Sequence, residues 1–220
     1  MIAYWSRREE PARSQLRRSR ALLTSTAPAA IRTLWWKRLA SGVLRRLRVR
    51  RLRVEFVYRH DLTNIPAVPL DPACRIEVLD PAQVERLLEA YPVNMAEKHR
   101  RLAAGHICYI GLADGKVAHF NWVQSDGVHL IPPAGRRRRV RPGEIWIYSS
   151  RTAEWARGRR LQPATLVAIL EDFRRNGYSR AWICTERENL ASQRGIERVG
   201  FRLVKKWRIL LLSRYCIPLP

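Results

Sequence analysis

The sequence predicts a mixed α/β (α+β) domain, because strand-like and helix-like patterns follow one another along residues 75–212. Residues 116–124 alternate with a period of two, which is typical of a strand. Leu166, Leu170 and Phe173 lie three or four residues apart, which is typical of one face of a helix. The predicted order of elements is β-α-α-β-β-β-α-β-α-β-β, with no internal repeat.

The first predicted elements are a strand and two capped helices. Residues 75–79 have the composition of a short strand. Asp80 is a good N-cap for a helix that Pro92 ends, and Asn94 begins a second helix that Gly105 ends. Both helices are therefore expected to lie ahead of the main strands.

A hairpin is expected next. Residues 106–113 and 116–124 form its strands, because the pair Asp114-Gly115 favours a tight two-residue turn. We expect the arginine-rich segment 136–141 in the loop that follows, and a third strand at residues 144–150.

The last third returns to helical periodicity. A helix begins at about Gln162, with Pro163 in its first turn and Gly177 just past its end. The remaining pattern predicts a strand at 179–185, a short helix from Asn189 to Gly200, and two strands at 201–204 and 207–212.

Length and composition fit one domain with an extension. The chain has 220 residues, of which 46% are hydrophobic, so it can bury a sizeable core and is not disordered throughout. The apolar run from Ile209 to Leu212 is only four residues, against the roughly 18 that a membrane span needs.

The net charge of +23 points first to nucleic acid or an anionic membrane. Residues 1–54 contain fifteen arginines and lysines against two acids, which is a charge of +13. The other 166 residues carry +10, part of it in the segment 136–141. More than half of the excess therefore lies in an N-terminal extension.

We expect residues 1–54 to form this extension and residues 55–220 the domain. Residues 1–30 lack periodicity and are expected to be flexible. Residues 31–54 predict a basic amphipathic helix, which is typical of a membrane surface. Docking on the chain's own domain and contact with RNA or DNA are the alternatives. No secretory signal is evident, so we expect a cytoplasmic protein, with peripheral contact to the inner face of a membrane left open.

The four cysteines predict neither a disulfide framework nor a zinc site. They are far apart in sequence, and no histidine lies at metal-ligand spacing from any of them. We therefore expect no metal and a reducing compartment.

A basic turn stands between the third main strand and the long helix. Its sequence is Arg157-Gly158-Arg159-Arg160-Leu161-Gln162. Free backbone N–H groups and the positive end of the helix dipole bind phosphate at such a turn, and arginines add charge-assisted hydrogen bonds. A solvated loop is the alternative interpretation.

This turn and the residues after it resemble the GNAT superfamily of N-acyltransferases. That family has Arg/Gln-x-x-Gly-x-Gly/Ala between a strand and a helix, and later an Asn, a short helix and Gly-Phe. Arg157 stands at the first signature position, and Asn189, Gly200 and Phe201 fit the later pattern. The resemblance covers residues 75–212 and is most specific over about 60 residues, from Ile145 to Phe201. It implies a mixed, mostly antiparallel central sheet flanked by helices.

The resemblance also implies acyl-coenzyme A as co-substrate, bound where two central strands separate. The residues that it assigns to coenzyme A are Ser150, Arg151, Thr152, Arg157, Gly158, Arg159, Arg160, Leu161, Gln162, Asn189 and Ser192. Two departures stand out, since Arg160 and Gln162 replace the signature glycines and crowd the approach to the backbone. Ile196 also stands where many members have a tyrosine as general acid.

The resemblance implies a base on the third main strand, and a base is needed because an amine must be neutral to attack a thioester. Glu144 is the predicted base, and it shares a strand face with Tyr148, which is a candidate base, acid or substrate contact. The alternatives are a solvated charge at the strand edge for Glu144 and packing within the sheet for Tyr148.

Two functions follow. The first is an acyl-coenzyme-A-dependent N-acyltransferase, acting by direct transfer on a primary amine of a small molecule, an amino sugar or a lipid-linked acceptor. A softer similarity, in Ser192 to Phe201, is to GNAT-like proteins of bacterial surface polysaccharide or lipid modification. The second is a non-catalytic GNAT-like module that binds nucleic acid or anionic membrane. A homodimer is left open.

Overall fold

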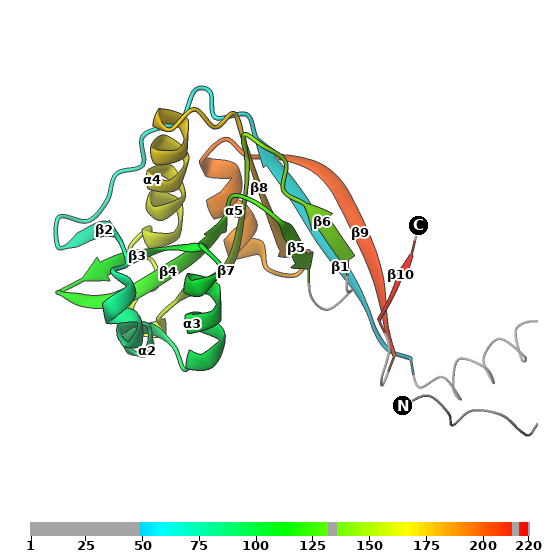
Figure 1. Ribbon diagram of the computed structural model, residues 1–220, viewed down its shortest axis with the longest axis horizontal. Helices are drawn as coiled ribbons and strands as arrows, with labels where there is room; N and C mark the ends of the chain where they lie inside the picture. The colour runs from blue at the N-terminus through cyan, green and yellow to red at the C-terminus, as the bar shows by residue number, and fades with distance from the viewer. Residues whose placement is uncertain (1–48, 132–135, 213–215, 220) are drawn as a thin grey trace, which may run out of the picture. The chain divides into compact units, whose positions relative to one another are not determined.

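The computed structural model describes residues 49–131, 136–212 and 216–219 (Figure 1). The predicted flexible segment 1–30, and the predicted helix as far as residue 48, lie outside the described residues. Within the described ranges no helix is long and apolar enough to cross a membrane.

An eight-stranded sheet forms the centre of the domain, in the order β10-β9-β1-β8-β7-β4-β3-β2. Every neighbouring pair is antiparallel except β7 and β8, which are parallel. The expected mixed, mostly antiparallel sheet is therefore confirmed. The strands are β1 (Val49–His60), β2 (Cys74–Val78), β3 (Ile107–Ala113), β4 (Lys116–Gln124), β7 (Glu144–Thr152), β8 (Arg180–Glu186), β9 (Arg202–Leu212) and β10 (Cys216–Leu219).

Helices and a small hairpin cover the sheet. The helices are α2 (Leu87–Ala90), α3 (Met95–Ala103), α4 (Leu161–Arg175) and α5 (Leu190–Arg198), with short 3₁₀ turns η1 (Pro81–Arg86) and η2 (Glu154–Ala156). The hairpin pairs β5 (Val128–Ile131) with β6 (Arg136–Arg139). Asp80 and Asn94 cap η1 and α3 with their side chains, as the sequence predicts.

Successive residues of β7 belong to two different hydrophobic clusters. Ile145 and Ile147 are fully buried in a cluster that includes Leu166 and Ile169 of α4. Trp146 is buried instead in a cluster with residues of the β5–β6 hairpin and β9. The two-residue period of β7 thus assigns α4 and the hairpin to opposite faces of the sheet.

Three sequence-based expectations are wrong. The last six residues of the predicted helix, Val49–Val54, begin strand β1, which continues across the predicted boundary at residue 55. The arginine segment is not a loop, since Arg136–Arg139 form β6. The two expected closing strands are one strand, β9. In the first case long-range pairing decides, because β1 hydrogen-bonds to β8 on one side and to β9 on the other.

The arginines of β6 form a strand because alternate side chains pack on tryptophans. The guanidinium carbon of Arg138 lies 3.7 Å from the Trp182 ring centre and 5.4 Å from that of Trp146. Arg136 lies 5.5 Å from the Trp207 ring. Such cation–π contacts let half-buried arginines cover an aromatic surface.

The two central strands separate partway along their length. The parallel pairing of β7 with β8 runs from Glu144 opposite Arg180 to Ile147 opposite Ile183. Beyond that point β7 follows β4 to Thr152, whereas β8 follows β1. A register shift against β4 and a positive φ of 53° at Ser149 mark a β-bulge at the point of separation.

We predict that Trp146→Ala destabilises the domain by about 3–5 kcal/mol, because it removes a fully buried ring from the centre of the sheet. The same substitution at Trp155, which is 50% exposed, is expected to change stability by less than about 0.5 kcal/mol. Urea unfolding followed by circular dichroism measures both. Equal losses for the two variants would contradict this assignment of the core.

Candidate functional site

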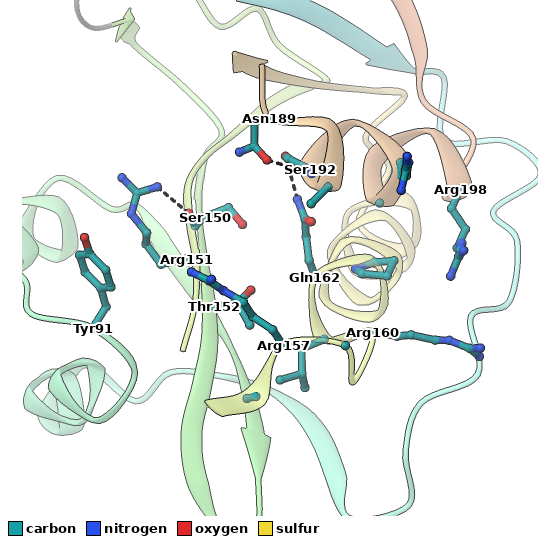
Figure 2. Close-up of a pocket in the computed structure, with 17 residues that line it drawn as sticks. Tyr91, Ser150, Arg151, Thr152, Arg157, Arg160, Gln162, Asn189, Ser192 and Arg198 are labelled. Carbon is teal, nitrogen blue, oxygen red and sulfur yellow. Dashed lines mark hydrogen bonds between the residues drawn. The ribbon is translucent and has the colours of Figure 1, made fainter. Parts of the chain in front are cut away.

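A cavity of about 790 Å³ lies where β7 has left β8. Its walls come from the end of β7, the turn before α4, and α5 (Figure 2). Of the eleven residues that the sequence assigns to coenzyme A, ten line this cavity. They are Ser150, Arg151, Thr152, Arg157, Gly158, Arg160, Leu161, Gln162, Asn189 and Ser192.

Arg159 is the residue that lies outside the lining. Its Nη1 atom is 2.8 Å from Oδ2 of Asp114, in the turn between β3 and β4. The side chain therefore ties the basic turn to the neighbouring hairpin and is not directed at the cavity.

The backbone of the turn has a conformation that favours glycine. Gly158 has a φ of 86°, and Arg160, the N-cap of α4, has a φ of 59°. No side chain caps the first turn of this 15-residue helix. Its free N–H groups and helix dipole make the cavity wall suitable for phosphate. Arg160 thus keeps a glycine-like backbone, while its side chain extends away from that of Arg157 (Figure 2).

Gln162 fills the space between α4 and α5. Its Nε2 atom donates a hydrogen bond to Oγ of Ser192 over 3.1 Å (Figure 2). A Cβ atom at Gly195 would lie 2.8 Å from Oε1 of Gln162, so any larger residue there would require the Gln162 side chain to shift. Asn189 accepts a 3.1 Å hydrogen bond from the Ser192 backbone N–H and so caps α5. Gln162 thus replaces the second signature glycine, and the residue that faces it on α5 is a glycine, Gly195.

The charge of the cavity wall is of one sign. Five arginines line it, and none of the described aspartates or glutamates does. They are Arg151, Arg157, Arg160, Arg194 and Arg198. Such a wall attracts a ligand with several negative charges. Arg194 and Arg198 were not among the residues predicted from the sequence, although their spacing of four residues on α5 indicates that they share a helix face.

Thr152, at the end of β7, contacts a buried histidine on the neighbouring strand β4. Nδ1 of His119 lies 2.7 Å from Oγ1 of Thr152. Burial lowers the pKa of His119 to about 3, so this imidazole is neutral at physiological pH. The contact fixes the strand edge without adding charge to the cavity.

Glu144 does not reach the cavity. It lies at the start of β7, six residues before Ser150, which is roughly 20 Å along a strand. The carboxylate is 3% exposed and lies 3.0 Å from Nη1 of Arg180 and 3.5 Å from Nη2 of Arg138. This geometry is that of a structural ion pair and does not support the predicted role as base.

Tyr148 lies at the point where β7 leaves β8, two residues before the cavity lining begins. Its hydroxyl is 2.5 Å from Nδ1 of His106, the residue before β3. The guanidinium carbon of Arg101, from α3, is 4.8 Å from the centre of the Tyr148 ring. Burial raises the pKa of the phenol, so Tyr148 is protonated at neutral pH.

The position at which many members of the superfamily have a tyrosine is buried in this protein. Ile196, on α5, is 0% exposed and packs in the cluster between the sheet and α4. A general acid cannot be supplied from this position. Among the described residues, no group of three or more His, Cys, Asp or Glu side chains is arranged to hold a metal ion.

Comparison with known proteins finds similarity in structure only. No family model matches the chain, and no curated protein does. A GCN5-related N-acetyltransferase from Sphaerobacter thermophilus superposes with a TM-score of 0.55 at 16% identity. The match covers 77% of this chain and 54% of that one, so the chain spans about half of that relative's length.

Two further solved structures also superpose on this chain. A glucosamine N-acetyltransferase region of a fungal multi-domain β-N-acetylglucosaminidase matches with a TM-score of 0.53 and 12% identity, over 78% of this chain and 22% of that one. A tandem GNAT protein of clavulanic acid biosynthesis matches with a TM-score of 0.51 and 13% identity, over 77% and 56%. The domain has the GNAT fold.

The GNAT fold confirms the resemblance that the sequence carries, at the level of architecture. At 12–16% identity the likeness to these structures concerns the fold and not the substrate. The cavity of this domain has an arginine-rich wall, and Gln162 fills the position of the second signature glycine.

We predict that Arg160→Gly stabilises the protein by about 1 kcal/mol, because glycine adopts a φ of 59° without the steric cost that arginine has. Arg157→Gly serves as the control, since Arg157 has a φ of −63° and gains nothing from glycine. Urea unfolding compares the two. A loss of stability in Arg160→Gly would contradict the expected backbone strain.

Glu144→Gln is expected to lower stability by about 1–3 kcal/mol, because Arg138 and Arg180 lose their buried charged partner. Binding of acetyl-coenzyme A, measured by calorimetry, should stay within twofold of wild type. A variant with full stability and abolished acyl transfer would instead make Glu144 the base.

Proposed function

We propose that this protein is an N-acyltransferase that takes an acyl group from acyl-coenzyme A and transfers it directly to a primary amine. The observation that carries the proposal is the cavity at the open edge of β7, whose wall contains five arginines and no acid. Coenzyme A has a pyrophosphate and a further phosphate, so its charge complements this wall. The GNAT fold supports the same chemistry.

The two ends of the donor suit different parts of the site. The turn before α4 and the arginines of α5 would hold the phosphates. Ser150, Arg151 and Thr152 would offer backbone groups to the pantetheine arm, since this edge of β7 has no pairing with β8. The thioester would then lie toward the point of separation, near Tyr148.

Direct transfer is favoured over a covalent acyl-cysteine, because Cys108 and Cys184 are poor nucleophiles. Burial raises the pKa of the Cys184 thiol to about 12 and also raises that of Cys108. Both thiols are therefore protonated at neutral pH.

The acceptor is proposed only as a class: a small-molecule amine, an amino sugar or a lipid-linked amine. One structural relative is described as a glucosamine N-acetyltransferase, which makes D-glucosamine a reasonable first probe. Contact of the basic extension with the inner face of a membrane remains part of the proposal, and it rests on the sequence of residues 31–48.

A second candidate function is a non-catalytic module that binds nucleic acid or anionic membrane. The side chains of Arg160 and Gln162 in place of glycines favour it, since they narrow the approach to the turn. Binding to RNA, DNA or anionic vesicles that weakens with salt and ignores coenzyme A would support this function.

Calorimetric titration with acetyl-coenzyme A tests the main proposal, and the double variant Arg194→Ala/Arg198→Ala sharpens it. We expect the dissociation constant of coenzyme A to rise at least about tenfold, because two charge-assisted contacts to phosphate are lost. Arg174→Ala, an exposed arginine near the other end of α4, is the control and should bind like wild type. Absence of wild-type binding at millimolar ligand would overturn the proposed donor.

A further inference from the structure

Tyr148 lies where a reacting thioester would come to rest. β7 and β8 are paired up to Ile147 and Ile183, so Tyr148 is the first residue beyond the paired segment. The cavity begins two residues later, at Ser150. Tyr148 packs against the cluster of Trp146 and the β5–β6 hairpin, and also against a second cluster that contains Trp122 of β4. An acceptor that enters from the side of this hairpin would meet the Tyr148 side chain at the point of separation.

His106 is placed to exchange a proton with Tyr148. Its Nδ1 atom lies 2.5 Å from the Tyr148 oxygen, and the two rings are nearly perpendicular, at 88°. The two residues are 42 apart in sequence, so the contact exists only because β4 brings β3 and β7 onto its two sides. His106 is only half-buried, which leaves the imidazole partly open to solvent.

Burial is the main reason that both groups are neutral. Burial and then the positive charge of Arg101 lower the pKa of His106, against an opposing effect of Asp126. Burial raises the pKa of Tyr148, and Glu97 and Cys108 act in the same direction, against Arg101.

His129 is the other titratable group that faces Tyr148. Its ring centre lies 4.6 Å from that of Tyr148, and its Nδ1 pairs with Oε1 of Gln124. Burial lowers the pKa of His129 to about 4, so this ring too is neutral at physiological pH. At neutral pH, Tyr148 can therefore donate its hydroxyl proton to Nδ1 of His106.

We propose that Tyr148 and His106 act as a proton relay, in which Tyr148 touches the reacting amine and His106 positions and receives the proton. This inference rests on the proposed acyltransferase function and deepens it. It assigns to Tyr148 and His106 the task that Glu144 is too far away to perform and that Ile196 cannot perform.

The relay balances over one catalytic cycle. As the amine nitrogen forms its bond to the thioester carbon, it gives a proton to the Tyr148 oxygen, while the Tyr148 hydroxyl proton moves to Nδ1 of His106. The carbon–sulfur bond then breaks. The departing sulfur takes a proton from Tyr148, which recovers its own from His106, so the amide and a free thiol result and both residues return to their starting state.

The test is the pH dependence of thiol release from acetyl-coenzyme A, with D-glucosamine as acceptor and with water alone. In wild type, kcat/KM calculated for the neutral form of the acceptor amine, which removes the acceptor's own protonation from the profile, should fall on acidification with an apparent pKa below 6.5, because protonated His106 cannot accept a proton. His106→Asn keeps a hydrogen-bonding atom near the Nδ1 position but cannot act as a base. We expect it to lose this acid limb and about a hundredfold in rate at pH 7.5.

Three variants separate the relay from a structural role. Tyr148→Phe and the double variant Tyr148→Phe/His106→Asn should be about as slow as His106→Asn, because residues of one relay are not additive. His99→Asn, at an exposed position on α3, should leave the profile unchanged. Acetyl-coenzyme A should bind all variants within twofold of wild type.

The outcomes distinguish this inference from the proposed function. A wild type that binds acetyl-coenzyme A and releases thiol, with an acid limb that survives in His106→Asn or disappears only in His129→Asn, would overturn the relay alone. A wild type that neither binds nor cleaves acetyl-coenzyme A would overturn both. Nitrogen NMR of the free protein adds a check without acceptor, since a proton found on Nδ1 of His106 would contradict the direction of transfer.

Discussion

The separation of β7 from β8 is the feature on which the rest of the site depends. Parallel pairing ends at Ile147 and Ile183, because β7 continues along β4 while β8 continues along β1. The bulge at Ser149 adds to the bend. The unpaired edge of β7 and the cavity both lie beyond this divergence, Tyr148 is the first residue past the paired segment, and that segment is packed on both of its faces.

The positions of the positive charges in the structure change how the net charge is explained. Of the net charge of +23, the part in residues 1–54 lies largely outside the described domain. Within the domain, arginines have three separate uses. Arg136 and Arg138 cover tryptophans, Arg180 holds the carboxylate of Glu144, and five others line one cavity that has no acid. The arginines of this cavity support the proposed binding of coenzyme A more directly than a general affinity for polyanions.

The departures from the GNAT signature are compensated locally. Arg160 retains a glycine-like φ, and the side chain of Gln162 is accommodated because Gly195 stands opposite. Both substitutions change side chains near the turn while the backbone N–H groups of α4 remain uncapped by side chains. The chain therefore keeps the free backbone N–H groups that bind phosphate, although two side chains now stand beside them.

Much of the fold was predictable from the sequence, because caps, tight turns and periodicity depend on residues close together in the chain. Asp80, Asn94, Asp114-Gly115 and the turn at 157–162 are of this kind, and ten of the eleven predicted coenzyme A residues do line the cavity. Tertiary structure alone decided the contacts between distant segments. It turned residues 49–54 into a strand of the sheet, paired Glu144 with Arg180 and brought His106 to Tyr148, since these depend on pairing partners that no local pattern specifies.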